Sequence, residues 1–506
     1  MPQSLIELLP EITSNGRQKA LGILENCKNG AGVPAWKQGL VLPRSGADRS
    51  RNDGIKKHAI GQWLNHFLHG DNLAVMQVLL AGDAAAGIPC LMEKIDLIYI
   101  DPPFDSSADY RAKIRLPDGS AGHEPAVMEQ FAYSDIWEQG TASYLEMLYV
   151  RLVLMKELLS NEGSIYVHID WHAGHYVKLL LDDIFGKDNF VNEIIWCYQG
   201  TGEPHKAFKR KHDTIFFYRK GDNYIFNAGS ASEPISEFSK SKYTKSDEKG
   251  AYKEIRHSNG KVFRQYQKET MRLRDVWDIP VINAVAAERL DFSTQKPQAL
   301  LERIIAVSSN EGSIVADFFG GSGTAAAAAE KLRRRWVFSD VGSPACMISR
   351  KRLAALCARP FFCHALGTGE NADKAVIKIK EPRLTLPGNG RALLEIELDG
   401  YELLPGALPA VDKKSRQLKK SAMDDPLALI DYWAIDPDYD GKVFYPLWQN
   451  FREVNARDIK PVKRSAAIDV LPTNSEWQIC VSAADIFGNE SRIVISAKQP
   501  LHTRTS

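Results

Sequence analysis

The stretch Lys94–Phe104, KIDLIYIDPPF, decides the fold of this chain. Residues 95–100 form a nearly continuous apolar run that is rich in β-branched and aromatic residues, which is typical of a strand buried on both faces of a parallel sheet. Two prolines follow Asp101 directly, and because proline has no N–H for a ladder, the strand must end there. The stretch therefore places a carboxylate, a stiff turn and the ring of Phe104 at the carboxyl end of a central strand, where open α/β sheets bind ligands.

This strand tip predicts a specific chemistry. Asp101 and the backbone carbonyl of Pro102 can together accept two hydrogen bonds from one –NH2 group. A conjugated amine held in this way loses planarity, so its lone pair becomes available to attack an electrophilic methyl group. Pro103 keeps the turn stiff, and Phe104 offers a face on which a planar base can stack. The alternative is an ordinary Asp-Pro turn, as at Asp436-Pro437.

A second unit of strand and turn occurs late in the chain. Residues 312–317 predict a strand that ends in Asp317, and a glycine-rich turn and a helix-favouring run follow it. Strand, glycine-rich loop and helix in this order let a backbone approach a nucleotide-like ligand closely. The next strand, 336–340, ends in Asp340, whose carboxylate can accept both hydroxyls of a ribose. The turn lacks the patterns Gly-x-Gly-x-x-Gly and Gly-Lys-Ser/Thr, which disfavours pyrophosphate and triphosphate ligands.

Two further strands are predicted to end in acidic residues. Asp71 follows a strand and precedes a helix over residues 73–80, so it either bonds an adenine amine or caps that helix. Another strand covers residues 163–170. The side chains near its tip that suggest a metal site are His168, Asp170, His172 and His175. No cysteine joins them and they straddle a strand end and a new helix, so we favour packing roles and predict no metal.

The stretch from His205 to Asp275 is basic. It holds seventeen Lys or Arg residues against nine Asp or Glu, an excess of eight in a chain whose net charge is +1. Aromatic residues are interleaved with these charges, as in surfaces that neutralise a nucleic-acid backbone. The candidate DNA contacts are Lys206, Lys209, Arg210 and Lys211. A solvated, charge-rich insertion has the same composition and is the alternative interpretation.

The rest of the chain suggests accessory parts. The first 60 residues predict a partly flexible extension with a short amphipathic start and a polar stretch from Arg44 to Lys57. Pro387, Gly388 and Gly390 form a linker-like break, and the short alternating runs beyond it predict a small all-β domain that is separable from the chemistry.

The chain has no signal peptide, no apolar run near 18 residues and seven scattered cysteines. We therefore expect a cytoplasmic protein without a membrane partner.

Three features occur together: the Asp101–Phe104 motif, the Phe319–Gly323 loop and a basic insertion between them. With them the chain resembles the S-adenosylmethionine-dependent amino-methyltransferases of DNA, and in particular the β-ordered group that includes Mod subunits of type III restriction–modification systems. The glycine loop comes 216 positions after the catalytic motif, as in that circularly permuted group. The resemblance covers residues 60–360. It implies an α/β fold with a mostly parallel, seven-stranded, Rossmann-like sheet and helices on both faces.

The resemblance also implies roles for individual residues. Asp101, Pro102, Pro103 and Phe104 would form the catalytic loop. The residues that would bind the cofactor are Asp71, Thr294, Gln295, Lys296, Pro297, Asp317, Phe319, Gly320, Gly321, Gly323 and Asp340. Among these, Asp340 would take the ribose hydroxyls and Asp71 the adenine amine, while residues 294–297 match a segment that closes over the cofactor. The family often has alanine where this chain has glycine in the loop, and it commonly has threonine at the position of Ala325. Neither difference removes a needed group.

The implied organisation has five parts: an N-terminal extension (1–60), the catalytic half (61–200), a target-recognition and DNA-binding insertion (201–290), the half that binds S-adenosylmethionine (291–375), and a β-rich accessory domain (384–506). The implied reaction is methyl transfer to the N6 amine of adenine in double-stranded DNA, within a restriction–modification or related system. In the family, enzymes with Asp at the first motif position mostly methylate adenine, and those with Ser there mostly methylate N4 of cytosine.

Alternatives to this function remain open from the sequence. One is an N4-cytosine DNA methyltransferase, because cytosine also presents a conjugated amine. Another, from a different class, is a non-catalytic DNA-specificity module with a degenerate pocket. Methylation of RNA or of a protein amide is disfavoured, since its motif usually begins with Asn. The expected partner is double-stranded DNA, and the resemblance also allows a restriction (helicase/nuclease) subunit and a homodimer.

Overall fold

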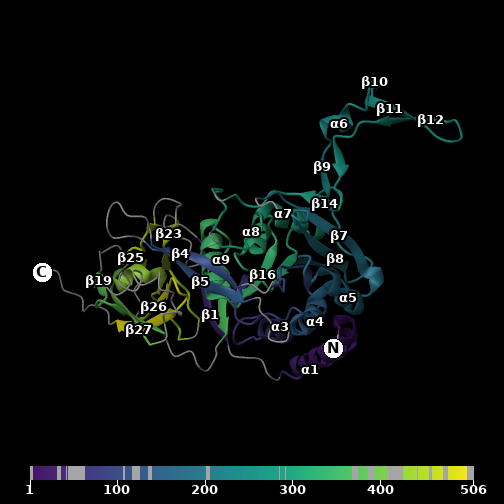
Figure 1. The fold of residues 1–506 in the computed structure, drawn as a ribbon. Coiled ribbons are helices and arrows are strands. Elements are labelled where there is room, and N and C mark those ends of the chain that lie inside the picture. Colours follow the sequence, from purple (N-terminus) through teal and green to yellow (C-terminus); the bar gives the residue numbers. More distant parts are fainter. Residues whose placement is uncertain are drawn as a thin grey trace.

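A computed structural model of the chain has an α/β body, a projecting arm and a C-terminal β module (Figure 1). The structure describes residues 4–30, 36–41, 43, 63–105, 109–116, 126–134, 140–200, 205–283, 285–290, 292–366, 374–385, 392–405, 407, 425–441, 443–454, 459–470 and 477–497. The polar stretch from Arg44 to Lys57 and the linker-like break at Pro387, Gly388 and Gly390 lie outside the described residues.

The body is built on a sheet of ten described strands in the order β1-β17-β2-β16-β15-β3-β6-β8-β7-β14. The seven strands from β2 to β7 in this order form the predicted methyltransferase sheet. Their bounds are β2 Asn65–His69, β16 Arg335–Asp340, β15 Ile314–Asp317, β3 Ile95–Ile100, β6 Leu159–Ile169, β8 His212–Arg219 and β7 Phe190–Cys197. The first five are parallel, and β8 is antiparallel to both neighbours. The permuted order is confirmed, because the late strands β15 and β16 pair with the early strands β3 and β2.

Helices cover both faces of this sheet, which explains why β3 is apolar at every position except Asp96. Ile98 and Ile100 pack in one core with the helices α3 (Asn72–Ala81), α4 (Thr141–Leu158) and α5 (Gly174–Phe185). Leu97 and Tyr99 point to the other face and pack in a core with α7 (Gln298–Ser308), α8 (Thr324–Lys331) and α9 (Ser343–Ala355). A 3-10 turn, η2 (Lys187–Asn189), leads from α5 into β7. Within the described ranges, no helix combines the length and apolar character needed to cross a membrane.

Three more strands make the sheet wider than the predicted seven. β17 (Phe361–Leu366) lies parallel to β2, β1 (Trp36–Val41) lies antiparallel to β17, and β14 (Val276–Asp278) lies parallel to β7. The strand β1 belongs to the stretch for which the sequence suggested only an extension. Its sequence, WKQGLV, contains two polar residues and a glycine, so it gives little strand signal until β17 is beside it.

The N-terminal stretch also forms a long helix, α1 (Leu5–Lys28), which packs against α4. Gly16 permits the close approach, because a Cβ at this position would lie 2.5 Å from the ring of Tyr149. Arg17 adds an ion pair of 2.9 Å to Asp183. The short amphipathic start that the sequence suggested is therefore 24 residues of helix attached to the body.

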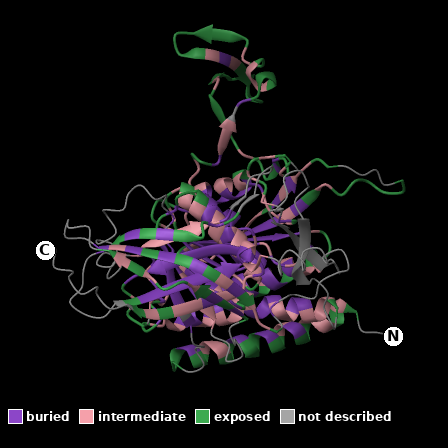
Figure 2. Ribbon diagram, turned by 90° about the vertical axis from the view of Figure 1, so that its left-hand side faces the viewer, coloured by how far each residue is buried: buried purple, intermediate pink, exposed green. Residues whose placement is uncertain are grey.

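The basic insertion has two parts in the structure. Its first part includes β8, which is an inner strand of the sheet. Its second part is an arm that projects from the body beyond β14 (Figure 1) and is largely exposed (Figure 2). The elements of the arm are β9 Ser232–Pro234, α6 Glu237–Lys240, β10 Lys245–Asp247, β11 Gly250–Arg256, β12 Val262–Tyr266 and β13 Thr270–Arg272. A separate hairpin pairs β4 (Asp109–Leu116) with β5 (Ala126–Ser134).

The C-terminal module is all-β, as the sequence predicts. One sheet contains β18 Ala375–Ile379, β19 Arg383–Thr385, β20 Ala392–Leu403 and β25 Ser465–Val470. A second sheet contains β21 Ile430–Asp436, β22 Trp448–Phe451, β26 Trp477–Asp485 and β27 Glu490–Ala497. The remaining elements are η4 Pro426–Leu429, β23 Glu453–Val454 and β24 Ile459–Lys460. Apolar residues of both sheets, with Trp433 fully buried, share one core.

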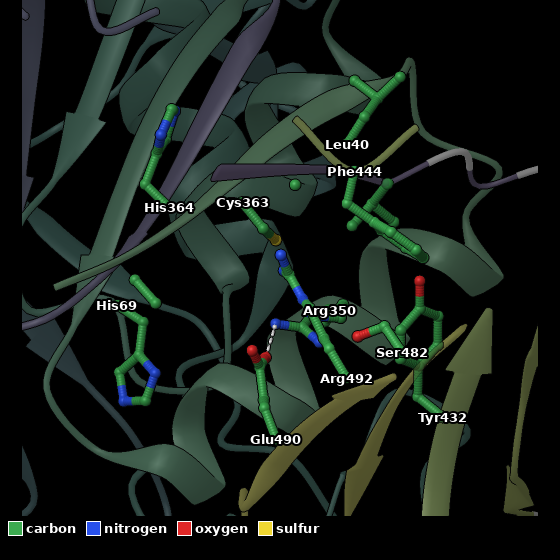
Figure 3. A pocket seen from close by; sticks show the side chains of 13 residues that line it. Leu40, His69, Arg350, Cys363, His364, Tyr432, Phe444, Ser482, Glu490 and Arg492 are labelled. Carbon is green, nitrogen blue, oxygen red and sulfur yellow. Dashed lines mark hydrogen bonds and ion pairs between the residues drawn. The ribbon is translucent and has the colours of Figure 1, made fainter. Parts of the chain in front are cut away.

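The module is docked on the body through polar contacts. Arg350 of α9 donates a hydrogen bond of 3.1 Å to Glu490 of β27 in a small cavity between the two parts (Figure 3). The next residue of the helix, Lys351, donates to the buried carboxylate of Asp431 at 2.5 Å. The backbone N–H of Leu40 in β1 donates to the carbonyl of Phe444 at 2.9 Å. The module is therefore attached to the body by two charged pairs and a backbone hydrogen bond.

We expect a chain that ends near Ala375 to melt at a lower temperature than the full chain, by roughly 5 °C or more. The truncation removes Glu490 and Asp431, so two cations of α9 lose their carboxylate partners. The measurement is thermal unfolding of both chains in the same buffer. A truncated chain with an unchanged melting temperature would show that the module is an independent domain, as the sequence suggested.

Candidate active site

Acidic residues of four parallel strands meet at one edge of the sheet. Asp317 and Asp340 end β15 and β16, while Asp101 follows β3 and Asp71 comes two residues after β2. Because the carboxyl ends of parallel strands share an edge, these side chains gather around one cavity. Its volume is about 420 Å³. The predicted site residues that line it are Asp71, Asp101, Pro102, Pro103, Phe104, Thr294, Lys296, Asp317, Phe319, Gly320, Gly321 and Asp340.

Three predicted residues do not line the cavity but support the segments that do. The side chain of Gln295 accepts a hydrogen bond from the N–H of Leu290 at 2.8 Å and donates to the carbonyl of Glu288 at 2.6 Å. Pro297 directly precedes α7 and is its N-cap residue. Gly323 directly precedes α8 and is its N-cap residue. Their positions link the cavity wall to the helices behind it.

The two oxygens of the Asp101 carboxylate differ in their hydrogen bonding. Lys296 Nζ donates a hydrogen bond to Oδ2, and the same ammonium lies 5.2 Å from the centre of the Phe104 ring. Oδ1 is buried and has no hydrogen-bond partner within the described part of the chain. A buried acceptor without a partner is costly unless a ligand supplies the donor. The tip of β3 therefore offers one open acceptor beside an aromatic ring.

A buried polar network supports Phe104 from behind. The ring of His168 lies 5.9 Å from the Phe104 ring. The imidazole Nδ1 shares a hydrogen bond of 2.8 Å with the hydroxyl of Tyr99, and Nε2 lies 3.2 Å from Asp213. Asp213 also accepts a hydrogen bond from Tyr198 at 3.1 Å. His168 is thus engaged in packing behind the aromatic wall, and no sequence pattern indicated its hydrogen bond to Tyr99.

The acidic residue at the tip of β6, Asp170, is bonded to a neighbouring histidine. Asp170 accepts two hydrogen bonds from His172, one from its backbone N–H at 2.9 Å and one involving its ring Nδ1 at 2.6 Å. Across the ranges that the structure describes, no group of three or more His, Cys, Asp or Glu side chains is arranged to hold a metal ion.

The glycine loop has three glycines that are required for different reasons. A Cβ at Gly320 would lie 1.9 Å from the ring of Phe338, so the strand behind the loop excludes any side chain there. Gly323 has a φ of +73°, and a Cβ there would lie 2.8 Å from Ser349 Oγ, so its backbone conformation and its packing against Ser349 both require glycine. Gly321 lines the cavity and has a φ of +53°, which disfavours a side chain by itself.

The charges of the loop and its neighbouring strand make the cavity acidic. Burial, with the negative charges of Asp101 and Asp340, raises the pKa of Asp317 well above its ordinary value. Burial also raises the pKa of Asp340, although its carboxylate accepts hydrogen bonds from the N–H groups of Gly342 at 2.7 Å and Gly321 at 2.8 Å. A cavity with several carboxylates favours a ligand that carries positive charge.

Asp71 serves as the cap of α3. Its Oδ1 accepts a hydrogen bond from the N–H of Leu73 at 2.8 Å, which is the capping role that the sequence left open. Its Oδ2 pairs with Arg151 of α4 at 3.2 Å. The neighbouring Asn72 donates to the carbonyl of Phe318 at 3.0 Å and so ties α3 to the glycine loop. Arg151 and Asn72 line the cavity and were missed, because their partners come from distant segments.

The basic cluster lies at the same edge of the sheet as the cavity. It precedes β8, which is antiparallel, so its residues adjoin the carboxyl end of β6. Lys206, Lys209 and Arg210 are exposed and Lys211 is half-buried. The guanidinium of Arg210 lies 3.9 Å from the ring centre of Trp171, directly after Asp170. Cations are thus displayed next to the carboxyl end of β6, at the edge of the sheet that carries the cavity.

Comparison with known proteins identifies the family. The family model described as DNA methylase matches residues 95–351, a span of 257 of the 506 residues and thus half of the chain. The chain belongs to this DNA methylase family. The methyl donor of the family is S-adenosylmethionine.

Several named relatives are similar to this methylase. The type II methyltransferase M.EcaI of Enterobacter cloacae is 28% identical over 57% of this chain and 69% of its own length. The StyLTI Mod subunit of a type III restriction–modification enzyme of Salmonella typhimurium is 26% identical over 53% of this chain and 50% of its own length. The DNA adenine methyltransferase YhdJ of Escherichia coli is 24% identical over 59% of this chain and 86% of its own length.

Proposed function

We propose that this DNA methylase transfers a methyl group from S-adenosylmethionine to the N6 amine of adenine in double-stranded DNA. The observation that carries the proposal is the pair of acceptors at the tip of β3, where Asp101 Oδ1 is buried without a partner and the Pro102 carbonyl follows it. The ring of Phe104 stands beside them on the cavity wall. A flipped base with an exocyclic amine satisfies all three groups at once.

The cavity also fits the cofactor. Asp340 would take the ribose hydroxyls and Asp71 the adenine amine, while Thr294, Asp317, Phe319 and the loop glycines would surround the methionine part. When bound, S-adenosylmethionine supplies an electrophilic methyl group on a positively charged sulfur. The fit has two supports in the structure: the group of buried carboxylates that favours a cation, and the cavity wall at Gly321, which has no side chain.

The chain's own residues would align and activate the amine. Asp101 Oδ1 and the Pro102 carbonyl accept its two hydrogens, which turns the lone pair of N6 towards the methyl carbon. The new N–C bond forms as the C–S bond breaks, and its electron pair stays on sulfur. One proton of N6 passes to Asp101 and on to water. Phe104 stacks on the base and keeps its plane fixed during the transfer.

The choice of adenine rests on the acceptor. In the resembling family an Asp at this position goes mostly with adenine, and YhdJ is named as an adenine methyltransferase. The test is to incubate the enzyme with methyl-labelled cofactor and unmethylated duplex DNA, digest the DNA and separate the nucleosides. We expect the label in N6-methyl-2′-deoxyadenosine. Label in N4-methylcytosine alone would refute the base assignment, and no label in DNA would favour a non-catalytic specificity module.

We propose that the DNA lies over the basic cluster and the arm, within the recognition insertion at 201–290. Replacing Lys206, Lys209, Arg210 and Lys211 with alanine should weaken DNA binding and flatten its salt dependence, by roughly one unit of slope per lost phosphate contact. Affinity for the cofactor should stay the same. Replacing Lys378 and Lys380 of the C-terminal module is the matched control. An unaltered salt slope in the fourfold variant would move the DNA surface to another part of the chain.

The similarity to a Mod subunit supports a role in a restriction–modification system, with a restriction subunit as partner. A homodimer stays a prediction. All seven cysteines are free, which suits the reducing cytoplasm, where we propose that the enzyme meets its DNA.

A further inference from the structure

Lys296 is held at a fixed place between the two halves of the site. It belongs to the segment that leads into α7, 195 positions after Asp101. The hydroxyl of Thr324 donates to its carbonyl at 3.3 Å, and Arg352 donates to that hydroxyl at 2.8 Å. Gln295 fixes the preceding turn. The backbone of Lys296 is thus tied to α8 and α9, and its side chain reaches across the cavity to β3.

The lysine and the aspartate form a largely buried ion pair. The side chain of Lys296 is 12% exposed and that of Asp101 is 17% exposed. Asp317 and Asp340 line the same cavity, so Asp101 lies among like charges. The other cation among the described lining residues, Arg151, pairs with Asp71 at the far side. Lys296 is therefore the cation that balances the carboxylate at the tip of β3.

The two carboxylate oxygens of Asp101 have different surroundings. Oδ2 is occupied by the ammonium, and Oδ1 is buried and open. A carboxylate that is held through one oxygen keeps a single orientation, and a charge-assisted hydrogen bond is roughly twice as strong as a neutral one. With Oδ2 engaged by the ammonium, Oδ1 is the oxygen of Asp101 that is left to accept a hydrogen.

We propose that Lys296 is a positioning residue for catalysis, which orients Asp101 through Oδ2 so that Oδ1 accepts a hydrogen from the target amine. The proposal rests on the proposed function and goes beyond it. It gives Lys296 a role towards the base, whereas the resemblance assigned the residue to the cofactor. In the transfer, N6 gains the methyl carbon, sulfur keeps the electron pair of the broken bond, and one N6 proton leaves through Asp101 to water. Lys296 keeps its own protons throughout.

Lys296→Met keeps an unbranched side chain that is one atom shorter, and it removes the charge and the N–H donors. At saturating cofactor and DNA, we expect the single-turnover rate of methyl transfer to fall by roughly 10²-fold, since a slightly misplaced acceptor costs about this much. The dissociation constants for S-adenosylmethionine and for DNA should change by less than about threefold. Lys296→Arg should recover most of the rate, because it keeps the charge and the donors. Lys331→Met on α8, which removes an exposed partner of Glu302 on α7, is the matched control.

A double-mutant cycle separates positioning from other roles. Asp101→Asn has no carboxylate to orient, so adding Lys296→Met to it should lower the rate by less than about threefold further. Full additivity of the two losses would overturn the proposal. It would also be overturned if Lys296→Met weakened cofactor binding and regained the normal rate at saturation, or if Lys296→Arg, melting at the normal temperature, were as slow as Lys296→Met. A wild-type chain that methylates no DNA would overturn the proposed function and this role with it.

Discussion

Replacement of Asp101 by alanine is expected to lower the rate of methyl transfer to duplex DNA by roughly 10³-fold, which is the upper range for removing one preorganised hydrogen-bonding group. The substitution removes the open acceptor Oδ1, and the Pro102 carbonyl alone cannot hold both hydrogens of the amine. The melting temperature should stay within a few degrees, because Asp101 has no structural partner besides Lys296 among the described residues.

The measurement is single-turnover transfer from labelled cofactor, with calorimetry for cofactor affinity. Asp101→Asn is the companion variant, since it keeps an oxygen acceptor and loses the charge. We expect its rate to lie between those of the wild type and Asp101→Ala. An alanine variant with a rate within tenfold of the wild type would mean that the amine is held by other groups, and the catalytic role of the Asp101–Phe104 motif would be lost.

Gly321→Val is expected to abolish measurable binding of S-adenosylmethionine. Gly321 lines the cavity, its φ of +53° disfavours a branched side chain, and a Cβ at this position would already lie 3.3 Å from the ring of Phe292. A valine must therefore move the loop or fill space beside it. Titration calorimetry of the purified variant measures the loss directly.

The control is Gly312→Val. Gly312 also has a left-handed φ, of +81°, but a Cβ there meets nothing within 4 Å, and the residue does not line the cavity. This control carries the backbone strain without the effect on ligand space. Near-normal cofactor affinity in Gly321→Val would contradict the assignment of the loop, whereas equal losses in both variants would trace the effect to strain.

Much of the site could be predicted because its residues follow strands. A buried run that stops at Asp101, or at Asp340, is visible in the sequence, and parallel strands bring such ends to one edge. The order of the motifs then implied a permuted sheet that combines early and late strands of the chain. The sheet order β16-β15-β3 meets that prediction.

The remaining features depend on pairs of segments that are far apart in the chain. The sequence cannot reveal that Lys296 reaches Asp101, that Arg151 pairs with Asp71, or that His168 bonds Tyr99, since each contact exists only once the sheet is assembled. The docking of Glu490 on α9 was hidden for the same reason.

Local sequence patterns also led to a wrong prediction of secondary structure in the N-terminal stretch. Pro10 lies within α1, where a proline normally weakens a helix, and WKQGLV has few strand formers. Packing of Gly16 on Tyr149 and pairing of β1 with β17 outweigh these local preferences. Gly323 is a related case, because its conformation and Ser349 explain the glycine without any ligand.

The most direct test of adenine methylation by this chain is to express it in a host that lacks DNA methylation and to sequence the host genome for modified bases. We expect N6-methyladenine within one recurring sequence in cells with the wild-type gene, and none in cells with the Asp101→Ala gene. A genome without modified bases, despite folded protein that binds the cofactor, would contradict the proposed function. So would N6-methyladenine that persists with Asp101→Ala.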